Sequence, residues 1–236
     1  MSAFMRFFHV ILWQPLFNIL VVFYLLTGNL GIAIILLTLF VRFLLYSVQD
    51  KASKSQMEMQ LLQPELEEIK NKYKDNKEEQ GKQMMDLYKK HKINPFSSFV
   101  VMLIQLPVFI SVYNIFKTGI NTESLKYVYS FIPMPGEINN LFLGLNLSEP
   151  SPIIAVLVGV TFFFQMKFAT IDQPKTKKKG FGDMFQKQMV YMFPILFGFI
   201  MLQLPSALGI YLITGAIFLT VQQHFTKKKY SLQKNV

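Results

Sequence analysis

Long apolar runs separated by charged segments constrain this chain more than any other feature of its sequence. Each run approaches the roughly 20 residues that a helix needs to cross about 30 Å of hydrocarbon. Only 16% of all residues are charged, against about 25% in an ordinary soluble domain. The pattern predicts an all-α membrane protein, a bundle of five transmembrane helices with an N-terminal interfacial helix and a cytoplasmic helical hairpin.

The apolar runs and their breakers set the expected boundaries of each segment. Asn94-Pro95 and Pro205 mark two of them because proline disfavours a continuing helix. The expected transmembrane helices are 29–48, 95–117, 151–171, 189–204 and 205–223. The expected connections are a hairpin at 49–94, an extracytoplasmic loop at 118–150, a basic cytoplasmic loop at 172–188 and a basic tail at 224–236.

Residues 1–28 are apolar but interrupted by polar side chains, including Arg6 and His9. A retained amphipathic helix in the membrane interface fits this pattern, with Trp13 and Tyr24 at headgroup level. A cleaved signal peptide and an additional transmembrane helix are the alternatives.

Residues 49–94 are charged and favour helix, and Gly81 is their one glycine. Apolar side chains recur at steps of three and four residues from Met59 to Tyr73, and again from Met84 to Tyr88. Asp75-Asn76 separates the two stripes, which predicts two helices packed as a hairpin. A single solvated linker helix is the alternative.

The basic residues predict the orientation of the chain in the membrane. If the hairpin is cytoplasmic, then 49–95, 167–188 and 224–236 hold 10, 6 and 4 lysines, which is 20 of the 24 basic residues. The positive-inside rule then places the N-terminus outside and the C-terminus in the cytoplasm. The same rule accounts for the net charge of +10. The basic loop and tail are expected to contact anionic lipid, and the tail could also touch ribosomal RNA.

Arg42 lies inside the first expected transmembrane helix, and no aspartate or glutamate lies in any of the five. Its insertion costs about 2.5–3.5 kcal/mol, so the guanidinium requires water or a polar partner. Neutral polar residues in the expected transmembrane helices supply candidates. They are Thr38, Gln105, Thr161, Gln165 and Thr214. We predict that they line a wet, positively charged cavity open to the cytoplasm; alternatively, Arg42 reaches the interface and each glutamine joins one helix pair.

Several other kinds of site are excluded or unsupported by the sequence. The absence of cysteine excludes disulfides and thiolate metal sites, and the three histidines are far apart. Common hydrolase and metalloprotease motifs are missing. We therefore expect neither enzyme activity, a metal nor a cofactor. A small transporter or channel using the same cavity remains the main alternative function, with an assembly scaffold as another.

The order of several segments resembles the YidC/Oxa/Alb family of membrane protein insertases, in its short bacterial form without a large extracytoplasmic domain. The resemblance covers nearly the whole chain. It is carried by GIAIILLTLFVRFLLYSVQDKASKSQMEMQLLQPELEEIKNKY, MDLYKKHKINPFSSFVVMLIQLPVFISVYNIF, LVGVTFFFQMKF and QMVYMFPILFGFIMLQLPSALGIYLITGAIFLTVQQ. It implies a five-helix core in a bacterial cell membrane, with a hydrophilic groove open to cytoplasm and lipid.

The resemblance also implies partners and site residues. Arg42, Gln105 and Gln165 fall on the family's groove positions, and Lys51 to Lys92 on its hairpin for substrate, ribosome or partner contact. Nascent membrane proteins are the implied substrates, the ribosome and Sec translocon are further candidate partners, and a monomer is the expected working unit. Leu212 stands where many bacterial relatives have tryptophan, so the role of that tryptophan cannot be assigned to this chain.

Methionines in the hairpin have two interpretations. Flexible thioether side chains can offer adaptable contacts to varied clients, or they can fill the space between the hairpin's own helices. The residues concerned are Met57, Met59, Met84 and Met85.

Overall fold

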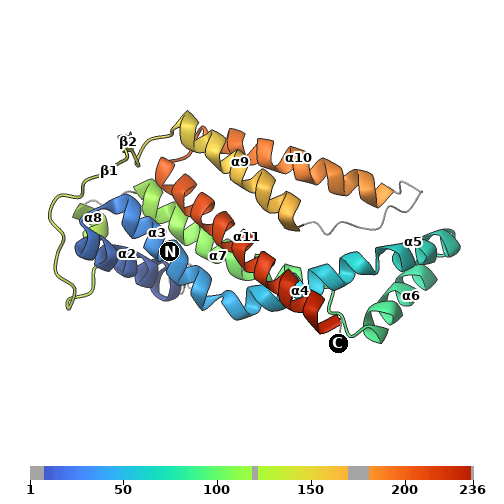
Figure 1. Cartoon of the computed structure of the whole chain (residues 1–236). Coiled ribbons are helices and arrows are strands. Elements are labelled where there is room, and N and C mark those ends of the chain that lie inside the picture. The colour runs from blue at the N-terminus through green and yellow to red at the C-terminus, as the bar shows by residue number, and fades with distance from the viewer. Residues whose placement is uncertain (1–7, 119–121, 170–180, 235–236) are drawn as a thin grey trace.

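Figure 1 shows the computed structural model of the chain, which describes residues 8–118, 122–169 and 181–234. It is an all-α membrane bundle with one two-stranded sheet among the described residues. The elements in chain order are η1 (His9–Trp13), α2 (Gln14–Thr27), α3 (Leu30–Leu44), α4 (Tyr46–Leu61), α5 (Gln63–Lys72), α6 (Lys77–Lys90), α7 (Ser97–Thr118), α8 (Thr122–Leu125), β1 (Leu141–Phe142), β2 (Leu145–Asn146), α9 (Pro152–Ala169), α10 (Phe181–Met201) and α11 (Ser206–Lys234).

The C-terminal helix α11 lies at the centre of the bundle. It packs against α3 on one side and α9 on the other, while α10 covers the far side of α9. Helix α7 packs against α4 and η1, and α2 packs against α3. The β1–β2 hairpin lies at the opposite end of the molecule from α5 and α6 (Figure 1). These contacts bury one apolar core shared by the N-terminal and C-terminal halves.

Glycine brings α9 and α10 into close contact. A Cβ added to Gly159 would meet the carbonyl oxygen of Pro194 at 3.3 Å, and one added to Gly198 would meet that of Ala155 at 3.3 Å. Small residues at such crossings let helix backbones approach each other, as membrane helices require when lipid gives no hydrophobic drive for association. This pairing fixes α10 to the bundle.

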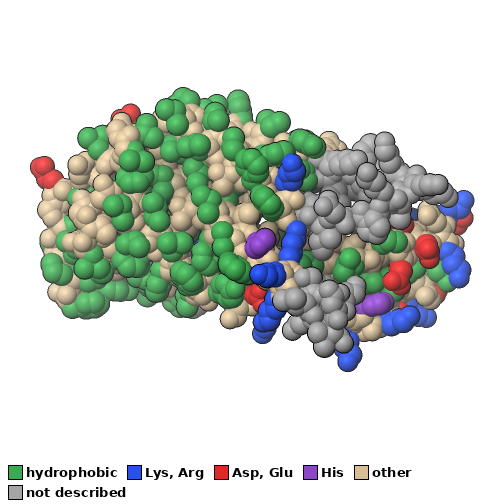
Figure 2. Space-filling view, viewed as in Figure 1, with side chains coloured by type: hydrophobic (Ala, Val, Ile, Leu, Met, Phe, Trp, Pro, Cys, Tyr) green, Lys and Arg blue, Asp and Glu red, His purple; other side chains and the backbone are tan. Residues whose placement is uncertain are grey.

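The surface divides into an apolar body and a charged end. Figure 2 shows hydrophobic side chains over most of the body, with lysines and most acids on this face gathered toward the α5–α6 end. By length and composition, the described helices that could each cross a membrane are His9–Thr27, Phe99–Lys117, Pro152–Ala169 and Ser206–Lys229, and Leu30–Leu44 with Tyr46–Leu61 qualifies as a bent pair. The distribution matches a protein surrounded by lipid over its body.

The first expected transmembrane helix is observed as two helices with a sharp bend. α3 and α4 meet at Leu45 at an angle of 66°, where the expected helix 29–48 would have continued. Leu45 has φ −90° and ψ 2°, outside the α-helical region. At the other end, Asn29 caps α3 by accepting a hydrogen bond from the backbone N–H of Ile32 at 3.1 Å. The bend directs α4 toward the hairpin.

The N-terminal helix is tied to the loop that follows α8. Asn18 is almost fully buried, donates to the carbonyl of Tyr127 at 3.0 Å and accepts from the backbone N–H of Tyr129 at 2.7 Å. Trp13 is buried within the protein and stacks on Phe17 with ring centroids 5.0 Å apart, and its expected depth at headgroup level stays a prediction. Length and composition would let 9–27 cross the membrane, so its interfacial placement stays a prediction.

Helices α5 and α6 form a hairpin that projects beyond the apolar body (Figure 1). Pro64 stands in the first turn of α5, where its missing N–H costs nothing. Asn76 caps α6 by accepting from the backbone N–H of Glu79 at 3.1 Å. A small core of its own holds the hairpin together, formed by Leu62, Leu66, Leu87, Tyr88 and Ile93.

Two boundaries near the C-terminus differ from the expected ones. α10 begins at Phe181, inside the segment expected to be a basic loop, and residues 170–180 lie outside the described residues. α11 continues to Lys234, through the segment expected to be a separate tail. Lysine and glutamine favour helix, and no glycine or proline follows residue 223 to stop it. The basic end of the chain therefore extends the last helix.

Candidate functional site

Arg42 and Gln105 meet within the bundle. Nη1 of Arg42, near the end of α3, donates a hydrogen bond to Oε1 of Gln105 on α7 at 3.2 Å. The guanidinium Nε is buried without a partner. Neither of the ion pairs seen among the described residues involves Arg42. The charge is therefore held by one neutral amide, and part of its bonding capacity remains unused.

Tyr211 completes this polar cluster from α11. Its hydroxyl accepts a hydrogen bond from Nε2 of Gln105 at 3.1 Å, and the side chain is fully buried. The tyrosine fixes which way the Gln105 amide faces, because the NH2 group bonds Tyr211 while the oxygen faces Arg42. Sequence reasoning missed Tyr211, which resembles an ordinary aromatic residue of an apolar run.

Gly215 provides the space that the guanidinium occupies. A Cβ added to Gly215 would lie 2.6 Å from Nη2 of Arg42 and 3.0 Å from Nε. Gly215 is nine residues from the start of α11 at Ser206, which is about 13 Å at 1.5 Å per residue. If α11 begins at the edge of the hydrocarbon, the positive charge lies near the middle of a layer about 30 Å thick. Gly215 was also missed, since a lone glycine in an apolar helix has many explanations.

Two of the three threonines expected in the cavity bond their hydroxyls within their own helices. Thr38 is fully buried and donates to the carbonyl of Ile34 at 2.7 Å, while Thr161 donates to that of Leu157 at 2.6 Å. Such bonds to the residue four positions earlier are common for threonine in helices. Among the described hydrogen bonds, Arg42 has none to either threonine.

The two remaining expected residues lie on the central helices without a bond to Arg42 among the described contacts. Gln165 is half-buried on α9, and Thr214 is half-buried on α11 beside Gly215. A small hollow of about 10 Å³ does adjoin the cluster between the α3–α4 bend and α7. It is lined by Leu45, Val48, Gln49, Val101, Ile104 and Gln105. Gln105 thus connects the arginine to the surface of the bundle.

The hairpin methionines divide between packing and exposure. Met59 and Met84 pack against the hairpin core, and Met57 is buried on α4. Met85 is exposed, at 39% of its surface. Burial in this core raises the pKa of Tyr88 above its ordinary value. Met85 is therefore exposed enough to contact a client, while Met57, Met59 and Met84 fill space inside the protein.

Known proteins share this arrangement over most of the chain. Residues 22–234 match the family described as 60Kd inner membrane protein. The chain belongs to that family. The resemblance to the YidC/Oxa/Alb insertases is thus confirmed, and the several apolar helices make this member a multi-pass inner-membrane protein.

The relatives include proteins of very different length. This family member is 34% identical over 205 residues to the membrane protein insertase YidC of Fusobacterium nucleatum, covering 86% of the chain and 88% of the relative. It is 33% identical over 236 residues to that of Caulobacter vibrioides, covering 94% of the chain but 37% of the relative. The crystal structure of an active YidC insertase with its first transmembrane domain resolved matches with a TM-score of 0.62 and 26% identity, covering 89% of this chain and 45% of that one.

Proposed function

We propose that this protein is a membrane protein insertase and chaperone, which moves hydrophobic segments with short polar flanks from the cytoplasm into the bilayer without nucleotide hydrolysis. Its family and the names of its relatives support the general activity. The observation that carries the mechanism is Arg42, a cation inside the helix bundle whose described partner is the neutral Gln105 and whose Nε is unsatisfied.

The polar cluster lowers the barrier to a translocating flank. An unsatisfied polar group in lipid costs several kcal/mol, and a flank that reaches Arg42 exchanges water for fixed hydrogen-bond partners. The guanidinium attracts acidic side chains and backbone carbonyls, and its Nε has no partner among the described residues. Gln105 accepts or donates beside it. Gln165 on α9 and Thr214 on α11 extend the path toward the hairpin end, forming the groove open to cytoplasm and lipid.

Hydrophobic partitioning drives the step. The client's apolar segment leaves water for lipid along the exposed faces of the bundle, and each buried Å² of apolar surface contributes about 25 cal/mol. Exposed apolar side chains such as Phe99 on α7 and Phe164 on α9 border that route. The hairpin, cytoplasmic in an orientation with the N-terminus outside and the C-terminus inside, receives nascent chains or the ribosome, and Met85 offers a flexible contact. The Sec translocon is a further partner, and the protein acts as a monomer.

Substitution of Arg42 tests this function. The assay measures insertion of a single-span reporter into proteoliposomes. The proteoliposomes contain the wild-type chain, Arg42→Ala or Arg42→Lys, and the reporter's flank is either acidic or neutral. We expect Arg42→Ala to reduce insertion of the acidic reporter about tenfold or more, since a hydrogen bond to a charged group contributes about 1.5–3 kcal/mol. Arg42→Lys keeps the charge and should retain most insertion.

The paired reporters separate the parts of the proposal. Equal activity of wild type and Arg42→Ala on both reporters would remove charge attraction from the mechanism. If wild-type protein inserts neither the acidic nor the neutral reporter, insertase activity itself would be contradicted. Ion flux through vesicles of wild-type protein, abolished by Arg42→Ala, would favour the transporter or channel alternative.

A further inference from the structure

The loop between α8 and α9 carries almost no charge, although much of it is exposed. Residues 127–148 contain one charged side chain, Glu137, where a soluble domain of that length would carry about five. Apolar side chains of the loop are instead exposed. Leu143 is 86% exposed and Phe131 is 80% exposed, the two highest values among the large hydrophobic side chains of the described residues. Exposed apolar surface of this kind marks a contact with lipid or with another apolar partner.

The β1–β2 hairpin presents Leu143 at its tip. Phe142 pairs with Leu145 across the two strands, which leaves Leu143 and Gly144 as the two residues of the turn. Both have positive φ, at 51° and 79°. This is the pattern of a type I′ turn, which favours asparagine followed by glycine. Leucine is strained at the first position, and its exposure shows that packing inside the protein does not offset the strain. An apolar contact outside the chain would account for it.

The base of the hairpin is fixed to the starts of two helices. The ring of Phe142 fills the space that a Cβ on Gly31, the second residue of α3, would occupy. Leu147, just after β2, is fully buried. Ser206, the first residue of α11, donates from its backbone N–H to the carbonyl of Glu149 at 2.9 Å. The tip is therefore held at a fixed level beside the starts of α3 and α11.

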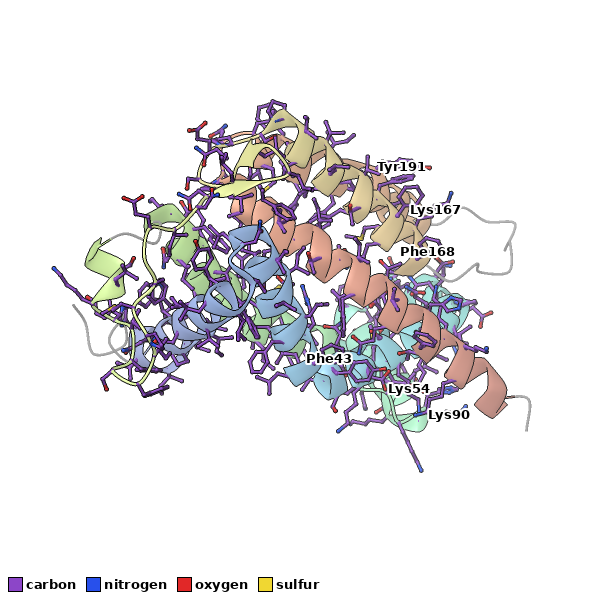
Figure 3. All side chains as sticks on the ribbon, turned by 60° about the vertical axis from the view of Figure 1, so that its left-hand side comes forward. Phe43, Lys54, Lys90, Lys167, Phe168 and Tyr191 are labelled. Atoms are coloured by element: carbon purple, nitrogen blue, oxygen red, sulfur yellow. The ribbon has the colours of Figure 1, made fainter. Side chains whose placement is uncertain are left out.

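Helix length indicates the depth of that tip in the membrane. α9 begins six residues after β2 ends, and its 18 residues rise about 27 Å, close to the hydrocarbon thickness of about 30 Å. Figure 3 shows β1 and β2 at the end where α9 and α11 begin, opposite the labelled Lys54 and Lys90. Ile153 in the first turn of α9 is 62% exposed, so apolar surface reaches this end of the bundle. The hairpin thus lies where hydrocarbon meets the headgroups.

We propose that the tip of the β1–β2 hairpin inserts into the lipid leaflet on the side of the membrane opposite the α5–α6 hairpin. Leu143 enters the leaflet together with Leu141, which is 57% exposed. Alternation along the strand turns Leu141 outward and Phe142 toward the core. Residues 127–148 contain no lysine or arginine, so the contact is with the apolar part of the leaflet and does not require anionic lipid. It anchors the loop in the membrane, a role separate from client movement at Arg42.

Spin labelling tests the depth of the tip without any insertion assay. The chain has no cysteine, so Leu143→Cys in the full chain carries one nitroxide in phosphatidylcholine nanodiscs. Power-saturation EPR compares collisions of the label with oxygen, which concentrates in lipid, and with a water-soluble nickel chelate. Ile195→Cys, at a position 72% exposed on apolar α10, calibrates lipid. Asp75→Cys, between α5 and α6, calibrates water. We expect the oxygen-to-nickel ratio at position 143 to lie closer to that at 195 than to that at 75.

A second pair of variants separates the apolar side chain from the turn. In labelled Leu141→Cys, the additional change Leu143→Asn relieves the backbone, because asparagine tolerates positive φ, but removes the apolar tip. We expect it to lower the oxygen-to-nickel ratio at position 141. Leu143→Phe is the matched control, since it keeps an apolar tip and should preserve the ratio. A ratio at position 143 equal to that at 75 would overturn the proposal and leave the tip for a protein partner. An unchanged ratio at position 141 in Leu143→Asn would overturn it as well.

Discussion

Gly215 offers a sharp test of how the arginine is positioned. In Gly215→Ala, the new Cβ would stand 2.6 Å from Nη2 of Arg42, whereas ordinary contacts begin at 3.4 Å. The guanidinium must therefore move by about 0.8 Å. The Arg42–Gln105 hydrogen bond is already 3.2 Å long, so such a shift away from α11 changes or breaks it. Because the displaced atoms end a flexible side chain, the fold should survive.

We expect a loss of function without a comparable loss of stability. A hydrogen bond to a charged group contributes about 1.5–3 kcal/mol, which corresponds to roughly tenfold or more in insertion of an acidic-flanked reporter. Thermal unfolding in detergent, followed by size-exclusion chromatography, should change little. Gly81→Ala is the matched control, since Gly81 lies on exposed α6 with nothing within 4 Å of an added Cβ. It should insert normally, and the hairpin should gain about 0.5–1 kcal/mol.

The two alanine variants give a clear contrary result. Gly215→Ala and Gly81→Ala could insert the acidic reporter equally well while Arg42→Ala does not. Insertion would then depend on the charge of Arg42 but not on its contact with Gly215 on α11. The close approach of Gly215 to Arg42 would then play no part in insertion.

Three further predictions concern the cluster and the hairpin. Tyr211→Phe removes the acceptor for Gln105 Nε2, so insertion should fall severalfold in the reporter assay, with the unfolding free energy reduced by about 1–3 kcal/mol. Asn76→Ala removes the cap of α6 and should destabilise the hairpin by about 1 kcal/mol, seen as faster proteolysis near residue 76 but unchanged melting of the bundle. Burial raises the pKa of Tyr88, so the stability it contributes is present below about pH 10, its unfolded pKa, and is lost as pH rises through the folded value. Circular dichroism should show this loss in wild type and not in Tyr88→Phe.

The sequence predicts the outline of the polar site from the free-energy cost of placing Arg42 in lipid. An arginine in an acid-free apolar run requires a neutral partner, and Gln105 is such a residue one helix away in sequence. Tyr211 and Gly215 could not be found this way, because tyrosine and glycine are ordinary in apolar helices. Their role appears only when the fold places α11 between α3 and α9.

Other differences have equally local causes. The bend at Leu45 carries no proline or glycine, the usual sequence signs of a kink, so a straight helix over 29–48 was expected. Thr38 lies four residues before Arg42 in α3, yet its hydroxyl bonds the backbone of its own helix. Periodicity identified the hairpin stripes, but only the contacts show which methionines face the hairpin core.

The most direct measurement of the central claim is site-specific photocross-linking to a stalled nascent membrane protein. The probe replaces Gln105, Gln165 or, as a control, Ile153, an exposed residue at the far end of α9 from the hairpin. Contact between the passing client and the polar cluster predicts adducts from positions 105 and 165 and none from 153. Silence from both glutamine positions, with the ribosome–nascent chain complex bound, would contradict a substrate path beside Arg42.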